Sequence, residues 1–156
     1  QQAESIAREQ DDAIVLAQIL SNRGVQALDK DSLDFDAAKG RNLSAEAAAI
    51  AEKHDLKILY FYSMLNQGAG QHELGHYDDA LGTHQRVYDF SQSEENHRWM
   101  ADALFAIGED YHKLNKREQA QQSLDKALQL YRDTRVIVKI DTLTNYMTDH
   151  NYTISS

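Results

Sequence analysis

The chain has 156 residues, which suffice for one domain with a hydrophobic core. Its 16 Lys and Arg against 25 Asp and Glu give a net charge of −9, and this acidity excludes a track for nucleic-acid phosphates, which needs an excess of cations. Cysteine is absent, so disulfides, thiolate nucleophiles and thiolate metal ligands are excluded.

The composition predicts an all-α protein. There is no Pro and there are only 7 Gly, whereas helix interiors exclude Pro and all-β folds depend on turn residues. The apolar runs are too short to span a bilayer, and the first residues lack the pattern of a signal peptide. We therefore expect no contact with a membrane and a cytoplasmic location. Because the first residue is not Met, we interpret the sequence as an excised domain or a processed chain.

An internal repeat organises the chain at a spacing of 40 residues. The stretches 68–81 and 108–121 match at this shift in four places: Gly68 with Gly108, His72 with His112, Leu74 with Leu114, and Ala80 with Ala120. Each repeat has the apolar pattern of a helix, a tight turn and a second helix. Small residues such as Gly108 and Ala120 mark the points where we expect the two helices to cross closely.

Three repeats follow in chain order, within a single domain of residues 1–156: they are predicted at approximately 10–54, 55–93 and 94–132. In the first repeat, the stretch 30–40 holds a few residues too many for a tight turn. In the second repeat, Gly75 is the predicted turn residue. Its counterpart in the third repeat is Asn115, which can adopt the left-handed conformation that ends a helix.

The boundary between the second and third repeats is predicted as a loop over 91–96. Ser91 and Glu94 have the spacing of a capping box that would open the next helix. After the third repeat, the segment 133–150 is predicted to form a capping helix or the first helix of a truncated fourth repeat, on the apolar spacing within 136–150. We expect a frayed tail beyond it.

The stretch 101–130 resembles a tetratricopeptide repeat. It carries that family's signature residues Leu104, Ile107, Gly108, Tyr111, Ala120, Leu124 and Ala127, and lacks only the Pro that usually closes the repeat. The second repeat fits the same pattern at Met64, Gly68, Leu74, Tyr77, Ala80 and Val87. The resemblance implies antiparallel helical hairpins stacked as a right-handed superhelix, with a concave groove lined by the first helix of each hairpin. The long spacing is similar to that of the longer-period repeats in bacterial regulatory and signalling proteins.

Residues 72–76 read HELGH, which is the HExxH signature of zinc hydrolases. Such a site needs both His on one face of an uninterrupted helix, with the Glu beside them as general base. In the repeat register His72 lies in the last turn of a helix, Gly75 forms the turn, and His76 follows it. We therefore predict no catalytic residue, no metal site and no cofactor, and keep a zinc-dependent hydrolase as an alternative hypothesis.

The resemblance also implies which residues line the groove. Carried over from the family, they are Tyr62, Leu65, Ala69, His72, Phe105, Glu109 and His112, with Glu73, Asp102 and Lys113 beside them and Gln18, Ser21 and Val25 in the first repeat. Such a mixture of aromatic, aliphatic and polar groups suits a short peptide or a partner helix, although Tyr62 and Phe105 could instead belong to the core. His84 stands where a packed aromatic residue is usual, and we interpret it as a partly buried structural residue.

These observations predict a non-catalytic interaction or sensor module of a larger signalling or transcription-regulating protein. A neutral or basic protein or peptide ligand is favoured by the net charge of −9. The carboxylate clamp of the family's chaperone-binding members is not expected, because its positions hold no cation. Besides the hydrolase, a self-associating scaffold remains an alternative, since apolar residues such as Val136 and Val138 would need cover at the end of the array.

Overall fold

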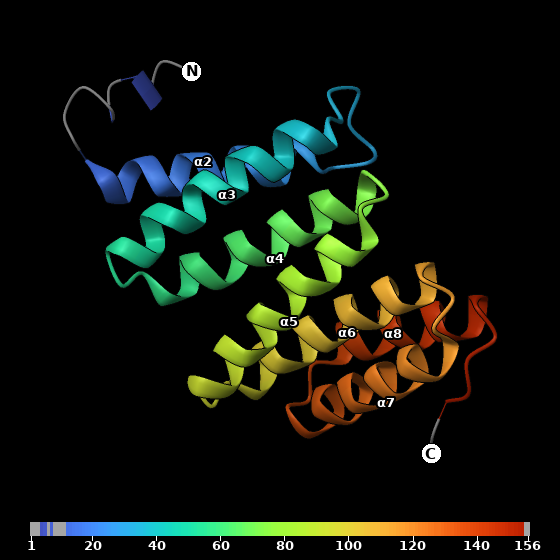
Figure 1. The fold of residues 1–156 in the computed structure, drawn as a ribbon. Helices are drawn as coiled ribbons and strands as arrows, with labels where there is room; N and C mark the ends of the chain where they lie inside the picture. Colours follow the sequence, from blue (N-terminus) through green and yellow to red (C-terminus); the bar gives the residue numbers. More distant parts are fainter. Residues whose placement is uncertain (1–3, 6, 8–11, 155–156) are drawn as a thin grey trace. The chain divides into compact units, whose positions relative to one another are not determined.

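The computed structural model describes residues 4–5, 7 and 12–154, and the secondary structure of this part is helical without strands. The helices are α2 (Ala13–Ala27), α3 (Ala37–Lys53), α4 (Lys57–Glu73), α5 (Tyr77–Ser93), α6 (His97–Lys113), α7 (Arg117–Asp133) and α8 (Ile137–Asp149) (Figure 1). The predicted all-α fold is therefore confirmed. From α3 onward, each helix begins 20 residues after the one before it, at 37, 57, 77, 97, 117 and 137.

The turns between these helices share one conformation. Asp55, Gly75, Glu95, Asn115 and Arg135 all have a positive φ, between 50° and 78°. In the turn after α6, the Asn115 N–H donates to the His112 carbonyl at 3.0 Å and the next N–H donates to the Tyr111 carbonyl at 2.9 Å. This is the Schellman pattern, which satisfies the last carbonyls of a helix and reverses the chain within three residues.

Polar side chains begin several helices. Asp12, Asp36 and Asn96 stand at the N-caps of α2, α3 and α6, and each accepts a hydrogen bond from a backbone N–H in the first turn. Such caps satisfy donors that have no partner inside the helix. The predicted capping box of Ser91 and Glu94 is wrong, because Asn96 caps α6. Ser91 lies inside α5, and its Oγ donates to the Val87 carbonyl at 2.7 Å.

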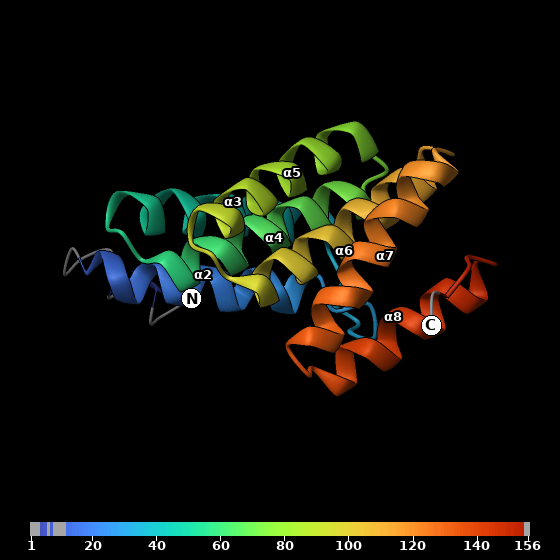
Figure 2. The same ribbon diagram turned by 90° about the horizontal axis from the view of Figure 1, so that it is seen from below.

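The chain divides into two compact units, with the boundary inside α5 between Thr83 and His84. In the N-terminal unit, α3 packs against both α2 and α4, and in the C-terminal unit α7 packs against both α6 and α8 (Figure 2). Consecutive helices within each unit therefore contact one another, as in an array of helical hairpins. The predicted division into three repeats stays a prediction.

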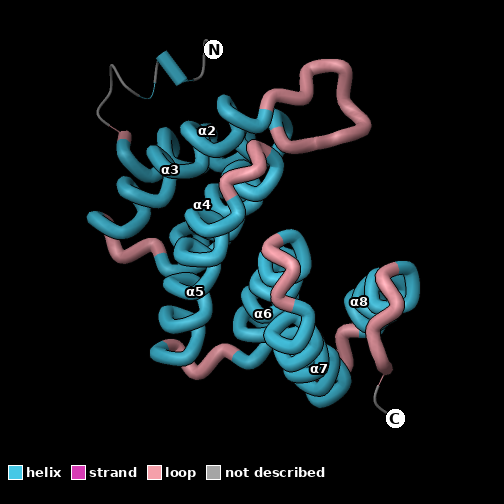
Figure 3. Tube along the Cα trace, turned by 45° about the vertical axis from the view of Figure 1, so that its right-hand side comes forward, coloured by secondary structure: helices cyan, strands magenta, loops and turns pink. Residues whose placement is uncertain are grey.

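Small residues bring the helices of the N-terminal unit close together. A Cβ atom at Gly24 would lie 2.5 Å from the Ser44 Oγ, and one at Gly70 would lie 2.7 Å from the Arg41 Cβ. The oversized connection that we expected over 30–40 runs from 28 to 36 and is seen in Figure 3 between α2 and α3. Gly40 lies inside α3, where a Cβ would meet the Leu28 side chain at 2.6 Å.

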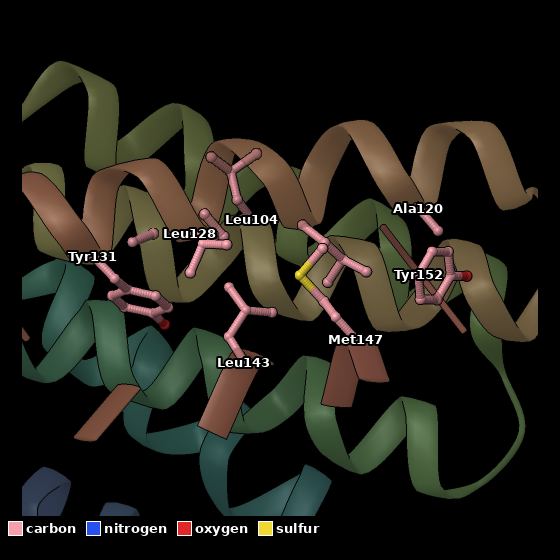
Figure 4. Packing of buried hydrophobic residues seen from close by; sticks show 10 residues of the cluster. Leu104, Ala120, Leu128, Tyr131, Leu143, Met147 and Tyr152 are labelled. Atoms are coloured by element: carbon pink, nitrogen blue, oxygen red, sulfur yellow. The ribbon is translucent and has the colours of Figure 1, made fainter. Parts of the chain in front are cut away.

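A hydrophobic cluster forms the core of the C-terminal unit (Figure 4). It joins residues of α6, α7 and α8: Ala101, Leu104, Ala120, Leu124, Ala127, Leu128, Tyr131, Leu143, Met147 and, after α8, Tyr152. Burying one large apolar side chain contributes about 1.5–3 kcal/mol. The close crossing predicted at Gly108 is confirmed, because a Cβ there would lie 2.5 Å from the Leu124 Cδ2.

The residues after α8 correct the expected frayed tail. Asn151 has a φ of 57° and reverses the chain, and the Tyr152 N–H donates to the Met147 carbonyl at 2.7 Å. The Tyr152 side chain is only 5% exposed. Sequence reasoning treated this part as a terminus with few contacts, whereas a tyrosine that fills a gap in the core holds it in place.

Candidate functional site

The HELGH motif forms the end of one helix and the turn that follows, as the repeat register predicts. His72 lies in the last turn of α4, Gly75 has a φ of 78°, and His76 stands just before α5. The His72 ring meets the Tyr77 ring edge-on at 5.1 Å, while the Glu73 carboxylate pairs with the Lys30 ammonium at 2.8 Å. The described residues contain no group of three or more His, Asp or Glu that could hold a metal ion. The geometry therefore gives no support to a zinc-dependent hydrolase.

Apolar side chains are exposed on α4 in the N-terminal unit. Positions 58, 62, 65, 69 and 72 follow one another by four and three residues, so they lie on one face of the helix. Ile58 is 66% exposed and Tyr62 is 41% exposed, whereas the side chains of Leu65, Ala69 and His72 are half-buried. This face carries the predicted groove residues of the second repeat.

The neighbouring helix α2 contacts α4 and carries an exposed apolar side chain of its own. Ser63 of α4 donates to Ser21 of α2, with 3.3 Å between the two Oγ atoms, and this buried bond ties the two helices together. Val25, one helical turn further along α2 from Ser21, is 50% exposed. We call the exposed side of these two helices, with Val25, Ile58 and Tyr62, the α2/α4 face.

In the C-terminal unit, the predicted groove residues already have partners within the chain. The Phe105 ring meets the Tyr146 ring of α8 edge-on at 5.5 Å and packs against the hydrophobic cluster. Asp102 is buried, accepts a 2.6 Å hydrogen bond from the Tyr131 hydroxyl and pairs with Lys139 at 3.2 Å. Burial, together with the Asp102 carboxylate, raises the pKa of Tyr131.

His112 lies under the residues that follow α8. Its Nδ1 is 2.8 Å from the Tyr152 hydroxyl, and its ring meets the His150 ring edge-on at 4.5 Å. Burial and the neighbouring His150, with smaller effects from Lys113 and Arg117, lower the pKa of His112 below its ordinary value of 6.5. His72 and His112 occupy equivalent repeat positions but have different neighbours. The His72 ring contacts Tyr77, whereas His112 contacts His150 and Tyr152.

His84 is a structural residue, as predicted, but it is more deeply buried than the partial burial that we expected. Its Nδ1 lies 2.6 Å from the Asp110 carboxylate, and both side chains are almost fully enclosed. The sequence did not reveal Asp110 as the partner of His84. Its equivalent in the second repeat is Gly70, so the repeat pattern does not mark this position as polar. A buried His is stable in such a position because its ring nitrogen is hydrogen-bonded.

The structure also brings together residues that the sequence pattern did not select. Arg117 and Gln121 of α7 contact the backbone of the residues after α8, and Tyr146 of α8 contacts Phe105. One feature of the sequence pointed to Tyr152. It stands 40 residues after His112, at the same shift that pairs His72 with His112.

Comparisons with known proteins agree with this architecture. Residues 60–133, which cover most of α4 and all of α5 to α7, match the tetratricopeptide repeat profile, whose repeats are in general protein-interaction modules. A search of curated proteins finds no significant match. Among the described helices, none combines the length and apolar character needed to cross a bilayer. The stretch 60–133 of this chain therefore belongs to the tetratricopeptide repeat family.

Proposed function

We propose that the chain is a non-catalytic interaction module that binds a peptide or a partner helix on its α2/α4 face. The observation that carries the proposal is the exposure of Val25, Ile58 and Tyr62 on two contacting helices, one of which, α4, lies mostly within the tetratricopeptide repeat match. Exposed apolar side chains that gather on one surface mark binding sites, and aromatic residues supply much of the binding energy at such sites.

The remaining groups of this face would set the register of the ligand. Leu65 and Ala69 offer half-buried apolar surface, and His72 offers a polar ring at the end of α4. A neutral or basic ligand fits best, since the chain carries a net charge of −9 and like charges across an interface are unfavourable.

Phe105, Glu109 and His112 of the C-terminal unit stay proposed contact residues in their own right, separate from the α2/α4 face. Phe105 and His112 contact Tyr146, and His112 also contacts Tyr152, so a ligand reaching them must compete with these side chains. We therefore expect Tyr62 to be the dominant anchor.

The wider role remains part of the proposal. The long repeat spacing resembles that of bacterial regulators, which favours a sensor or regulatory domain of a cytoplasmic signalling or transcription-regulating protein. A self-associating scaffold would instead use exposed apolar side chains such as Ile137 and Val138 of α8.

Selection of peptides on the immobilised chain, followed by titration of the selected peptides, tests this function. Tyr62→Ala should weaken binding at least about tenfold, because a buried aromatic anchor carries a large share of the binding free energy. The thermal midpoint should change little, since Tyr62 is 41% exposed.

Ile137→Ala is the matched control, because Ile137 is also an exposed apolar residue but lies on α8. Equal losses in the two variants would count against the α2/α4 face. Loss of binding in Ile137→Ala alone, with concentration-dependent association, would favour the scaffold instead.

A further inference from the structure

Residues 150–154, which we call the C-terminal segment, are held by side chains of α7. The Arg117 guanidinium donates to the carbonyl oxygens of His150 and Asn151. The Gln121 side-chain amide donates to the Thr153 carbonyl at 2.8 Å, and its carbonyl oxygen accepts the Thr153 N–H at 2.9 Å. Both hydrogen-bonding groups of one residue's backbone are thus paired by a single side chain, as they would be by a neighbouring strand.

Tyr152 anchors the segment between these backbone contacts. Its ring is buried in the hydrophobic cluster, next to residues of α7 and α8 (Figure 4). The Arg117 guanidinium carbon lies 4.5 Å from the ring centroid, a cation–π arrangement, and the hydroxyl meets the His112 Nδ1 at 2.8 Å. The Tyr152 ring therefore packs among apolar side chains, while its hydroxyl has a hydrogen-bonding partner in His112.

This arrangement has the parts of a peptide-binding site. Bonds to backbone groups give affinity that is independent of sequence, while a side-chain pocket gives specificity. The site is built by His112 at the end of α6 and by Arg117 and Gln121 at the start of α7. Only the ligand is unusual, because it belongs to the same chain.

We propose that the turn between α6 and α7 is a binding site for an extended peptide with a central tyrosine, and that the C-terminal segment occupies it in cis. The site is separate from the α2/α4 face, and its existence does not depend on the function proposed for that face. A ligand in trans gains access when the segment in cis is displaced.

The tether decides how strongly the segment in cis competes. A ligand joined to its site by a short stretch of chain has an effective concentration of the order of millimolar. A free peptide must overcome this advantage, so the wild-type chain should bind it weakly. Removing the anchor of the segment in cis should expose the site.

The probe is a fluorescent synthetic peptide with the sequence of residues 148–154, titrated into the full chain and followed by fluorescence anisotropy. Tyr152→Ala in the chain should tighten binding of this peptide at least about tenfold, because the competing anchor is lost. A peptide in which alanine replaces the tyrosine should not bind either chain measurably.

Gln121→Ala, added to the Tyr152→Ala chain, should weaken peptide binding about fivefold or more through loss of the paired backbone contacts. Gln122→Ala is the matched control, because Gln122 is the exposed neighbour and its side-chain amide donates to the Glu118 carboxylate at 3.5 Å. Tyr62→Ala should leave this binding unchanged, which separates the present site from the α2/α4 face.

The proposal is overturned if Tyr152→Ala keeps a cooperative unfolding transition and yet binds the peptide no more tightly than the wild type. It also fails if Gln121→Ala and Gln122→Ala have equal effects. Should Tyr152→Ala not fold, Thr153→Pro replaces it, because it removes the N–H that Gln121 accepts and keeps Tyr152 in the chain. That variant should then bind the peptide more tightly than the wild type, and an unchanged affinity would reject the site.

Discussion

At the scale of single residues, left-handed turn positions occupied by ordinary side chains leave room for stabilisation. Glu95 and Arg135 have φ values of 50° and 56°, where a Cβ atom is disfavoured. Glu95→Gly should raise the free energy of unfolding by about 0.5–1 kcal/mol, measured by urea denaturation. Gly75→Ala, at a φ of 78°, should lower it by a similar amount. A destabilised Glu95→Gly would show that the Glu95 side chain makes a contribution that outweighs its backbone strain.

Two glycines within helices should respond to alanine with opposite signs. At Gly82 of α5 an added Cβ would meet nothing within 4 Å, so Gly82→Ala should stabilise by about 0.5–1 kcal/mol through helix propensity. At Gly70 of α4 the Cβ would lie 2.9 Å from the Arg41 backbone N, which cannot move without shifting α3. Gly70→Ala should therefore destabilise by about 1–3 kcal/mol. Thermal denaturation of both variants checks this, and a shift in the same direction would contradict the packing of α3 on α4.

At the scale of elements, the contact between α6 and the C-terminal segment should depend on pH. The pKa of His112 is lowered in the folded chain, so the unfolded chain binds its proton at a higher pH than the folded one. The free energy of unfolding should therefore fall as the pH falls through and below the ordinary His value of 6.5. The groups that face His112 are His150, Tyr146 and Tyr152, with the cations Lys113 and Arg117 nearby.

His112→Gln isolates this contribution, because a neutral side chain cannot take up the proton. Urea denaturation of both chains at about pH 7.5 and about pH 5.5 should show a smaller loss of stability in the variant. Equal losses would mean that other groups, and not His112, cause the pH dependence.

Much of the element scale could be predicted from the sequence, because it depends on local patterns. The apolar spacing and the Gly108 crossing gave the hairpin of α6 and α7, and the register placed Gly75 in a turn. The end of α5 was misread for a physical reason. Glu95 adopts a left-handed conformation that side chains of its kind rarely adopt, so nothing in the sequence marked the turn there.

The candidate sites were harder to predict, because they depend on contacts between distant residues. The repeat pattern located Tyr62 and Phe105 on their helices but could not tell that α8 would cover Phe105 while Tyr62 stayed exposed. The burial of Tyr152 depends on a reversal at Asn151, and that of His84 depends on Asp110 in another helix. Neither Asn151 nor Asp110 stands at a signature position of the family.

At the scale of the whole molecule, the chain carries one proposed interaction surface in each compact unit. The α2/α4 face belongs to the N-terminal unit, and the site of the C-terminal segment belongs to the other. Because Tyr62 and Gln121 belong to different compact units, Tyr62→Ala and Gln121→Ala should act independently, with changes in binding free energy that add. Isothermal titration of the double variant with the selected peptide and with the 148–154 peptide tests this. A non-additive result would indicate that the two units are coupled.

The most direct measurement of the proposed function is the backbone amide NMR spectrum of the full chain during titration with a peptide selected for binding. We expect the largest shift changes on the α2/α4 face, around Val25, Tyr62, Leu65 and Ala69, with binding lost in Tyr62→Ala. Shift changes confined to α8 around Ile137 and Val138, or a selection that yields no peptide whose binding depends on Tyr62, would contradict the assignment of this face as the interaction surface.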